Sequence, residues 1–290
     1  MEKAAERESG IISQFIRLAR SGSSTGQYYK SMNHALYKMK DEYTMLHYPL
    51  YVNESEDFLS AQENLTRHCI SYIEPLEGKT VLEVGCGNGV QTKFLATYYK
   101  PKLITGIDLN RSNISIANRE KQRRGIEHVH FLVDDAQSMR KIKDNYFDVV
   151  INIESAFHYP DKQAFLHEIR RVLAPGGSFI IADIVSTTGS RKPDKITWKT
   201  RMKLHHWTLG QYHEGIRNAG LEIMASDNIT QDVIKGFLNY RSYFRHMKKR
   251  NIFYTAIFRL FYIINLRLNV RNLRNNKQYI IVSGFRPVTA

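Results

Sequence analysis

The sequence has few cysteines, no signal-like start and no uninterrupted hydrophobic run, and each shortage excludes a class of protein. Only two of the 290 residues are cysteine, Cys69 and Cys86, which is too few for a disulfide-stabilised secreted scaffold. The first ten residues, MEKAAERESG, lack the apolar core of a signal peptide. The most apolar stretch, residues 252–270, is interrupted by two arginines, so it is not expected to span a membrane. We expect a cytoplasmic or cytosol-facing protein.

Acidic residues are absent after Asp232, and this makes the charge of the chain strongly uneven. Residues 186–290 contain 19 Lys and Arg against 5 Asp and Glu, whereas residues 1–185 contain 23 of each. The whole net charge of +14 therefore lies in residues 186–290. A basic surplus favours an anionic partner, such as nucleic acid, anionic lipid or a phosphorylated substrate, and a merely solvated basic face is the alternative.

Short apolar runs alternate with amphipathic stretches through the middle of the chain. The expected strands are residues 80–84, 103–109, 128–133, 147–153, 178–183, 221–225 and 278–284, and the expected helices are 90–99, 112–124, 162–173 and 209–219. Strands that alternate with helices of this length indicate βαβ units. We expect an α/β fold with a mostly parallel sheet that is covered on both faces.

A glycine-rich turn, GCGNG at residues 85–89, follows the first expected strand and precedes a helix. Glycine allows a ligand to approach the backbone closely, and the carboxyl end of a strand is where open α/β sheets bind ligands. A dinucleotide fingerprint would be G-x-G-x-x-G, whereas this turn is G-x-G-x-G and is preceded by Glu83. Asp108 ends the second strand 21 residues after Gly87, where a carboxylate can accept both ribose hydroxyls. A nucleoside that carries an amino acid satisfies this pattern better than a dinucleotide.

Several motifs together resemble the class I S-adenosylmethionine-dependent methyltransferases. They are VLEVGCGNG (81–89), GIDLN (106–110), FLVDDA (131–136), FDVVINIESAFHYPD (147–161) and LAPGGSFIIADI (173–184). The resemblance is nearest to the lipid and polyketide methyltransferases of the phthiotriol type and to natural-product methyltransferases. It implies a Rossmann-like seven-stranded sheet whose last strand is antiparallel, and S-adenosylmethionine as the cofactor.

The resemblance also implies roles for individual residues, and it includes no metal site. Glu83 is expected to order the loop and the methionine end of the cofactor, and Asp108, followed by Leu109, is expected to bind the ribose. Asp135 and Ala136 match the pair that meets the adenine edge. Asn152 is expected beneath the methionine moiety, and the backbone contacts are expected from Gly85, Cys86, Gly87 and Gly89.

The stretch after the fourth expected strand, ESAFHYP (154–160), is expected to face the transferred methyl group. His158 is a candidate general base for a hydroxyl acceptor, because an imidazole titrates near neutral pH. A structural or cofactor-positioning role for His158 is the alternative. Glu154 is a second candidate base, or a group that stabilises a carbocation on a carbon acceptor. Tyr159 is expected to contact the substrate.

The N-terminal segment YYKSMN…LHYPLY resembles the segment that closes over the active site in natural-product methyltransferases. Tyr28 and Tyr29 are therefore expected to contact the cofactor, and His47 and Tyr48 the substrate. The chain departs from the family pattern at Lys30 and Pro49, where the relatives have Asp and Gly. Aromatic walls suit an apolar substrate, and simple packing of the tyrosines in a lid helix is the alternative.

The basic segment 241–277 contains a stretch with one apolar stripe and several arginines. The stripe comprises Phe253, Ile257, Leu260, Phe261, Ile264 and Leu268, and the arginines at 259, 267, 271 and 274 are expected on the other side. An Arg-rich helix with Phe and Leu opposite is typical of peripheral binding to an anionic membrane surface. A lid helix that buries this stripe on the substrate pocket is equally compatible with the sequence.

These observations predict a methyltransferase that acts on an oxygen or carbon of a lipophilic small molecule. A nucleic-acid methyltransferase that uses the basic part is the alternative, but the Asn/Asp-Pro-Pro-Tyr motif and an RNA-binding appendage are missing. A partner protein with the cofactor fold and no activity is a third reading, disfavoured by the intact glycine turn. The sequence carries no signal for an oligomeric state. The predicted parts are a helical lid (1–72), the cofactor-binding domain (73–232), the basic helical insert (233–277) and the final strand (278–290).

Overall fold

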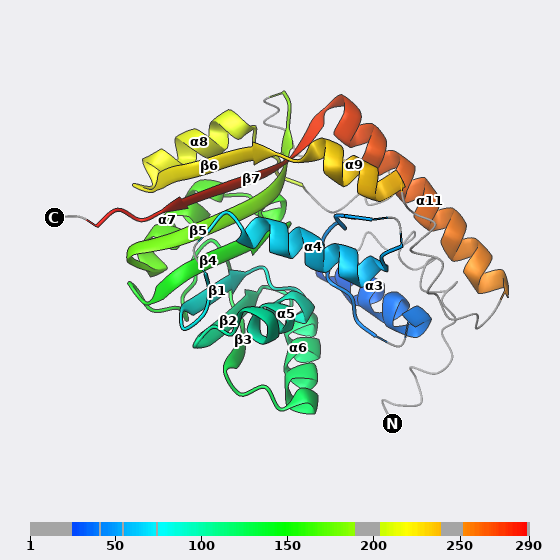
Figure 1. Cartoon of the computed structure of the whole chain (residues 1–290), viewed down its shortest axis with the longest axis horizontal. Coiled ribbons are helices and arrows are strands. Elements are labelled where there is room, and N and C mark those ends of the chain that lie inside the picture. The colour runs from blue at the N-terminus through cyan, green and yellow to red at the C-terminus, as the bar shows by residue number, and fades with distance from the viewer. Residues whose placement is uncertain are drawn as a thin grey trace.

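Seven strands form one sheet in the computed structural model, which describes residues 25–40, 42–53, 55–73, 75–188, 204–238 and 252–288. The strands are β1 (Thr80–Val84), β2 (Leu103–Asp108), β3 (Val129–Val133), β4 (Phe147–Ile153), β5 (Leu173–Ser186), β6 (Glu222–Asn228) and β7 (Lys277–Phe285). Their order in the sheet is β3-β2-β1-β4-β5-β7-β6 (Figure 1). Strands β1 to β5 all run parallel to one another. Strand β7 runs antiparallel to both of its neighbours, β5 and β6. The predicted Rossmann-like fold is confirmed.

Helices cover both faces of this sheet. They are α3 (Thr25–Lys40), α4 (Phe58–Ile70), α5 (Val90–Tyr99), α6 (Arg111–Arg124), α7 (Lys162–Val172), α8 (Leu209–Asn218), α9 (Thr230–Leu238) and α11 (Ile252–Asn275), with a short 3-10 helix η1 (Ala156–His158). Because side chains of a strand alternate between faces, Val149 and Ile151 of β4 join the core under α4, α5 and α9, whereas Val150 joins the core under α7 and α8. Burial on both faces explains why β4 is almost wholly apolar.

The strand order reverses between β1 and β4. From β1 the chain proceeds outward through β2 to β3 at the edge, and it then returns to place β4 on the other side of β1. The carboxyl ends of β1 and β4 therefore diverge into loops that lead to opposite sides of the sheet. This switch point is where open α/β sheets bind ligands, and it holds both the glycine turn and the stretch that begins at Glu154.

Polar caps fix where the helices next to this point begin. The side chain of Asn110 accepts a hydrogen bond from Ser112 N at 3.0 Å and starts α6 directly after β2. The side chain of Asp161 accepts from Ala164 N at 2.8 Å and starts α7 after η1. Each cap satisfies an amide that the first helical turn would leave unpaired, so the loops between strand and helix stay short.

Helices α3 and α4 precede the sheet in the chain, and α9 and α11 lie between β6 and β7 (Figure 1). Residues 1–24 of the predicted lid and 239–251 of the predicted insert lie outside the described residues. The division of the chain into the four predicted parts stays a prediction. Among the helices in the described ranges, none combines the length and the apolar character that crossing a bilayer requires.

The buried face of α11 differs from the predicted stripe. Leu266, Val270 and Leu273, spaced i, i+4 and i+7, pack into the core, whereas Leu260 (62% exposed), Ile264 (48%) and Leu268 (39%) face solvent. The side chains of the other stripe residues, Phe253, Ile257 and Phe261, lie outside those described, as does that of Arg259. The prediction that the arginines lie opposite the stripe is wrong for the described part, because Arg267 and Arg271 are exposed together with Ile264 and Leu268.

Candidate functional site

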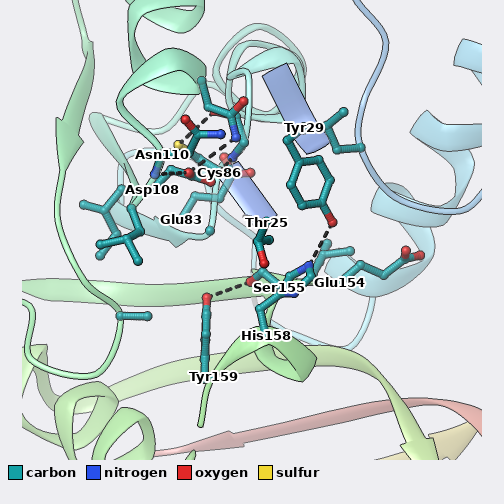
Figure 2. Close-up of a pocket in the computed structure, with 18 of the residues that line it drawn as sticks. Thr25, Tyr29, Glu83, Cys86, Asp108, Asn110, Glu154, Ser155, His158 and Tyr159 are labelled. Atoms are coloured by element: carbon teal, nitrogen blue, oxygen red, sulfur yellow. Dashed lines mark hydrogen bonds between the residues drawn. The ribbon is translucent and has the colours of Figure 1, made fainter. Parts of the chain in front are cut away.

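A cavity of about 430 Å³ lies at the carboxyl ends of β1, β2 and β4, below the first turns of α3. This volume falls in the range of small-molecule sites, about 300–1,000 Å³. The predicted residues that line it are Tyr29, His47, Glu83, Gly85, Cys86, Gly87, Asp108, Leu109, Asp135, Ala136, Glu154, His158 and Tyr159. The glycine turn (85–89) and the stretch ESAFHYP (154–160), about seventy residues apart in the chain, thus meet in one pocket (Figure 2).

The three glycines of the turn adopt backbone conformations that few other residues tolerate. Their φ angles are +75° for Gly85, +55° for Gly87 and +75° for Gly89, all in the left-handed region. A Cβ on Gly85 would collide with the side chain of Ser155, and one on Gly87 would lie 2.9 Å from Leu46 Cδ1. The glycines are therefore required by close approach of the protein's own chain as well as by any ligand.

The amide groups of this turn are already used within the protein. Gly85 N and Cys86 N donate to Ile107 O at 2.8 and 3.0 Å, Gly87 N donates to Asp108 Oδ2 at 3.0 Å, and Gly89 N donates to Cys86 O at 3.1 Å. A phosphate-binding turn needs free amides. This turn instead presents backbone carbonyl oxygens toward the cavity, and such acceptors suit a ligand with a positively charged amine.

Asp108 ends β2 and joins the turn to the next loop. Its Oδ1 accepts from Asn110 N at 2.7 Å, and its Oδ2 accepts from Gly87 N. Burial raises the pKa of Asp108, and the hydrogen bonds from Asn110, Gly87 and Asn113 oppose that effect. The carboxylate is thus held in place at the wall of the cavity.

Glu83 is linked through buried polar groups to residues 42–53, which connect α3 to α4 in the predicted lid and are called the lid segment below. Gln91 Nε2 donates to Glu83 Oε1 at 3.0 Å, and the Thr66 hydroxyl lies within hydrogen-bond distance of Gln91 Oε1 (3.4 Å) and His47 Nε2 (3.2 Å). His47 Nδ1 donates to Tyr48 O at 2.9 Å. Burial raises the pKa of Glu83 to about 8 and lowers that of His47 to about 4, so the His47 ring is neutral at neutral pH.

Glu154 begins the loop after β4 in a left-handed conformation, with φ of +50°. Its Oε1 accepts from Tyr48 N at 2.7 Å, which ties the lid segment to this loop. Burial raises the pKa of Glu154 to about 8, and the hydrogen bond from Tyr48 partly opposes the rise. A non-glycine residue in this conformation is strained, so its position is set by the surrounding contacts.

His158 faces the lid helix across the cavity. The Tyr29 hydroxyl and His158 Nε2 are 2.9 Å apart, and Figure 2 shows the Tyr29 ring pointing from α3 toward the imidazole. Burial raises the pKa of Tyr29 well above its usual value, so the phenol stays protonated. Beside this pair, the hydroxyls of Ser155 and Tyr159 are 2.8 Å apart, and Asn152 Nδ2 lies 2.6 Å from Ser155 Oγ.

Four predicted site residues do not line the cavity. A Cβ on Gly89 would meet Ala117 and Phe131, so this glycine serves helix packing. Asn152 is fully buried and donates to Val84 O at 2.9 Å, which joins the ends of β4 and β1. Tyr28 packs with Phe157 and Leu204, and the ring of Tyr48 packs 4.5 Å from that of Phe237.

Sequence reasoning missed several residues that line the cavity. Asn88, Gln91 and Ser155 stand inside or next to the motifs of the glycine turn and of ESAFHYP, and they line the cavity without a predicted role. Asn113 lies one helical turn after the cap of α6 and became visible as a site residue only in the fold. Met45 and Leu46 add apolar wall from the lid segment.

Comparison with known proteins agrees with this geometry. A family model described as a methyltransferase domain matches residues 75–239. A fatty-acid O-methyltransferase from Mycolicibacterium smegmatis is 32% identical over 184 residues, or 61% of this chain and 59% of the relative. A phthiotriol/phenolphthiotriol dimycocerosates methyltransferase from Mycobacterium leprae is 30% identical over 177 residues, or 61% of this chain and 57% of the relative. The chain thus spans less than two thirds of the length of these relatives.

A solved structure is similar over most of the chain. Phosphoethanolamine N-methyltransferase 2 from Haemonchus contortus, in complex with phosphomonomethylethanolamine and S-adenosylhomocysteine, aligns with a TM-score of 0.73 and 17% identity. The alignment covers 96% of this chain and 60% of that protein. At this identity the likeness shows the shared fold.

The chain belongs to the methyltransferase-domain family, because the family model matches more than half of it. Two solved structures of the Haemonchus contortus protein, which shares this fold, contain S-adenosylhomocysteine or S-adenosylmethionine. The residues present fit this group: the cavity carries Glu83 and Asp108, and the turn offers acceptors to a cationic ligand. No Lys or Arg lines the cavity within the described ranges.

Replacing Asp108 tests the ribose assignment. We expect Asp108→Ala to bind S-adenosylhomocysteine about 30-fold more weakly, because a charge-assisted hydrogen bond contributes about 2 kcal/mol. Titration calorimetry measures the affinity. Asp232→Ala removes an exposed acid on α9 and serves as the matched control. Equal affinity of Asp108→Ala and the wild type would contradict the assignment.

The buried carboxyl of Glu154 predicts a specific pH dependence of stability. Its pKa rises on folding from 4.5 to about 8, so between these values the native state binds more protons and stability falls as pH rises. Glu154→Gln keeps an acceptor for Tyr48 N and removes the titrating group, so the variant does not lose this stability as pH rises. We expect equal stability of variant and wild type near pH 5. Near pH 8.5 the variant should be more stable by at least about 1.4 kcal/mol, the free energy of one pKa unit.

Chemical denaturation at the two pH values measures this difference. The remaining pH dependence, to which Glu83 contributes, is common to both proteins and cancels in the comparison. A stability difference that is the same at both pH values would show that Glu154 is ionised in the folded protein.

Proposed function

We propose that the protein transfers the methyl group of S-adenosylmethionine to an oxygen or carbon of a lipophilic small molecule. The observation that carries the proposal is the composition of one cavity. Its cofactor wall holds Glu83 and Asp108, its opposite end holds Glu154 and His158, and Met45, Leu46 and Ile153 supply apolar surface. The relatives named as fatty-acid and phthiotriol dimycocerosate methyltransferases support the lipophilic class.

For an oxygen acceptor, His158 is the proposed general base. The cofactor supplies an activated methyl group when bound. His158 accepts the hydroxyl proton as the acceptor oxygen attacks, and proton removal of this kind needs a base within hydrogen-bond reach. Tyr29 remains protonated. In the proposed tautomer His158 Nε2–H donates to the Tyr29 oxygen and orients the ring, so that Nδ1 is the nitrogen that accepts the hydroxyl proton. Lid helix α3 thereby places the imidazole, and the lid excludes water from the proton transfer.

For a carbon acceptor, Glu154 is the proposed acid–base group. A pKa of about 8 leaves this carboxyl poised to gain or lose a proton near neutral pH. Its ionised form would also stabilise positive charge on a methylated alkene. Tyr159 and His47 are the proposed substrate contacts. The nucleic-acid alternative is not favoured, because the relatives are named for lipid substrates and no described Lys or Arg lines the cavity.

Methyl-labelled cofactor and lipid extracts test the proposal directly. We expect mass spectrometry to find labelled, organic-soluble product with the wild type. His158→Ala should form it roughly 10²–10⁴-fold more slowly, with little change in cofactor affinity, if the acceptor is a hydroxyl. His167→Ala, an exposed histidine on α7, is the matched control. A fall of less than tenfold in the rate of product formation returns His158 to a positioning role and favours Glu154 as the acid–base group. Label found only in water-soluble product contradicts the proposed class of lipophilic substrate.

We further propose that α11 docks the protein on an anionic membrane surface. Leu260, Ile264 and Leu268 are exposed, which supports an interfacial helix over a lid that buries this stripe in the pocket. Arg267, Arg271 and Arg274 are exposed beside them and form no ion pair with any described residue. Exposed apolar side chains next to unpaired arginines suit the boundary between head groups and acyl chains. Docking would give access to a substrate dissolved in the membrane.

Vesicle co-sedimentation tests this docking. Each basic group near an anionic surface contributes about 1 kcal/mol, so we expect binding to phosphatidylglycerol vesicles at low salt and little binding to phosphatidylcholine vesicles. Ile264→Asp and Arg267→Glu should each reduce the bound fraction. Arg217→Glu makes the same charge change on α8, away from α11, and should not. Absence of pelleting at low salt would leave α11 without a membrane role.

A further inference from the structure

One face of the lid helix α3 contacts three separate parts of the site. Gly26, Tyr29 and Asn33 are spaced i, i+3 and i+7 and therefore lie on the same side of the helix. Gly26 O accepts from Asn110 Nδ2 at 3.1 Å, and Tyr29 contacts His158. Asn33 reaches the cofactor wall. The same helix thus contacts both ends of the cavity.

Asn33 is the middle member of a chain of three buried asparagines. Asn88 Nδ2 donates to Asn33 Oδ1 at 2.9 Å, and Asn33 Nδ2 donates to Asn113 Oδ1 at 3.0 Å. Asn113 Nδ2 then lies 3.4 Å from Asp108 Oδ1. The three side chains are 1%, 2% and 2% exposed for Asn33, Asn88 and Asn113. A buried path of donors leads from the glycine turn through the lid to the carboxylate.

The direction of this chain follows from its fixed end. Asn88 Nδ2 also donates to Thr44 O at 2.8 Å, and because a carbonyl can only accept, this contact determines which end of the Asn88 amide is nitrogen. Asn88 Oδ1 accepts from Val90 N at 3.2 Å, in agreement. Every amide therefore donates toward Asp108, and hydrogen bonds aligned in this way strengthen one another in a buried environment.

Opening of α3 would break the chain in the middle. Asn88 would lose the acceptor Asn33 Oδ1 and Asn113 would lose the donor Asn33 Nδ2, and both side chains would have to find water or a ligand as the replacement partner. Conversely, a displaced Asp108 or glycine turn would leave Asn33 unpaired in the closed lid. The chain of hydrogen bonds is therefore complete only when α3 is closed and both Asp108 and the glycine turn hold their present positions.

We propose that Asn33, Asn88 and Asn113 are positioning residues that couple closure of α3 to occupancy of the cofactor site. Coupling of this kind is reciprocal: the cofactor stabilises the closed lid to the same extent that the closed lid stabilises cofactor binding. Tyr29 lies one turn from Asn33, so closure also brings the Tyr29 hydroxyl to His158. The state that favours the bound cofactor is thus also the state in which the imidazole is oriented. This inference does not depend on which acceptor is methylated.

Hydrogen exchange and calorimetry with S-adenosylhomocysteine test the coupling without any methyl acceptor. We expect the ligand to slow amide exchange across residues 25–40 of the wild type. Asn33→Ala should bind about tenfold more weakly, within the usual range of coupling between sites, and should lose this slowing. Gln27→Ala changes an exposed side chain of the same helix and should behave as the wild type.

A double-mutant cycle separates coupling from general destabilisation. Asn113→Ala should also weaken binding, and the double variant should lose less than the product of the two single effects, because both break one chain. Wild-type affinity and wild-type slowing of exchange in Asn33→Ala would overturn the proposal, as would independent effects in the cycle. If Asn33→Ala fails to fold in a thermal melt, Asn33→Asp is measured instead, because it keeps the size and removes the donor to Asn113.

Discussion

The pairing of β1 with β4 is the constraint on which the whole site depends. The two strands run parallel, with Val81 opposite Val149 and Glu83 opposite Ile151, so their carboxyl ends stop at the same level. Asn152 then bridges them by donating to Val84 O at 2.9 Å. This contact holds the glycine turn and the Glu154 loop at a fixed separation, because one follows each strand. A change in the register of this pair would displace one wall of the cavity relative to the other.

The electrostatics of the chain are divided between the cavity and the surface. Burial raises the pKa of Glu83, Asp108 and Glu154, which all line one cavity, whereas the basic surplus lies in residues 186–290. A cavity with acids and no described basic side chain favours a cationic ligand and disfavours a phosphorylated one. The buried acids therefore bear on what the cavity binds, whereas the basic surplus bears on the proposed docking of α11 at a membrane surface. This division is consistent with a cationic cofactor.

Sequence patterns predicted the centre of the sheet well because β1, β2 and β4 are buried on both faces. The β-branched runs of β1 and β4 and the motif spacings located the cavity walls, and thirteen predicted residues line it. The asparagine chain could not be predicted, since Asn33, Asn88 and Asn113 meet only after three distant segments fold together. The prediction for the arginines of α11 was wrong because Arg267 and Arg271 stand three residues after Ile264 and Leu268, which places them on the same side of a helix. In such a sequence, tertiary contacts with α9 and β7 decide which apolar residues are buried.

The antiparallel insertion of β7 has a consequence for biosynthesis. In the described sheet β6 pairs with β7 alone, and β5 presents to β7 the edge that does not face β4. Both strands precede β7 in the chain, so they leave the ribosome without their partner. At about 5–20 residues per second, the intervening α9 and α11 delay its arrival by several seconds. During that interval the growing chain exposes an apolar strand edge that other nascent chains can pair with, and chaperone binding to β5 would be most valuable then.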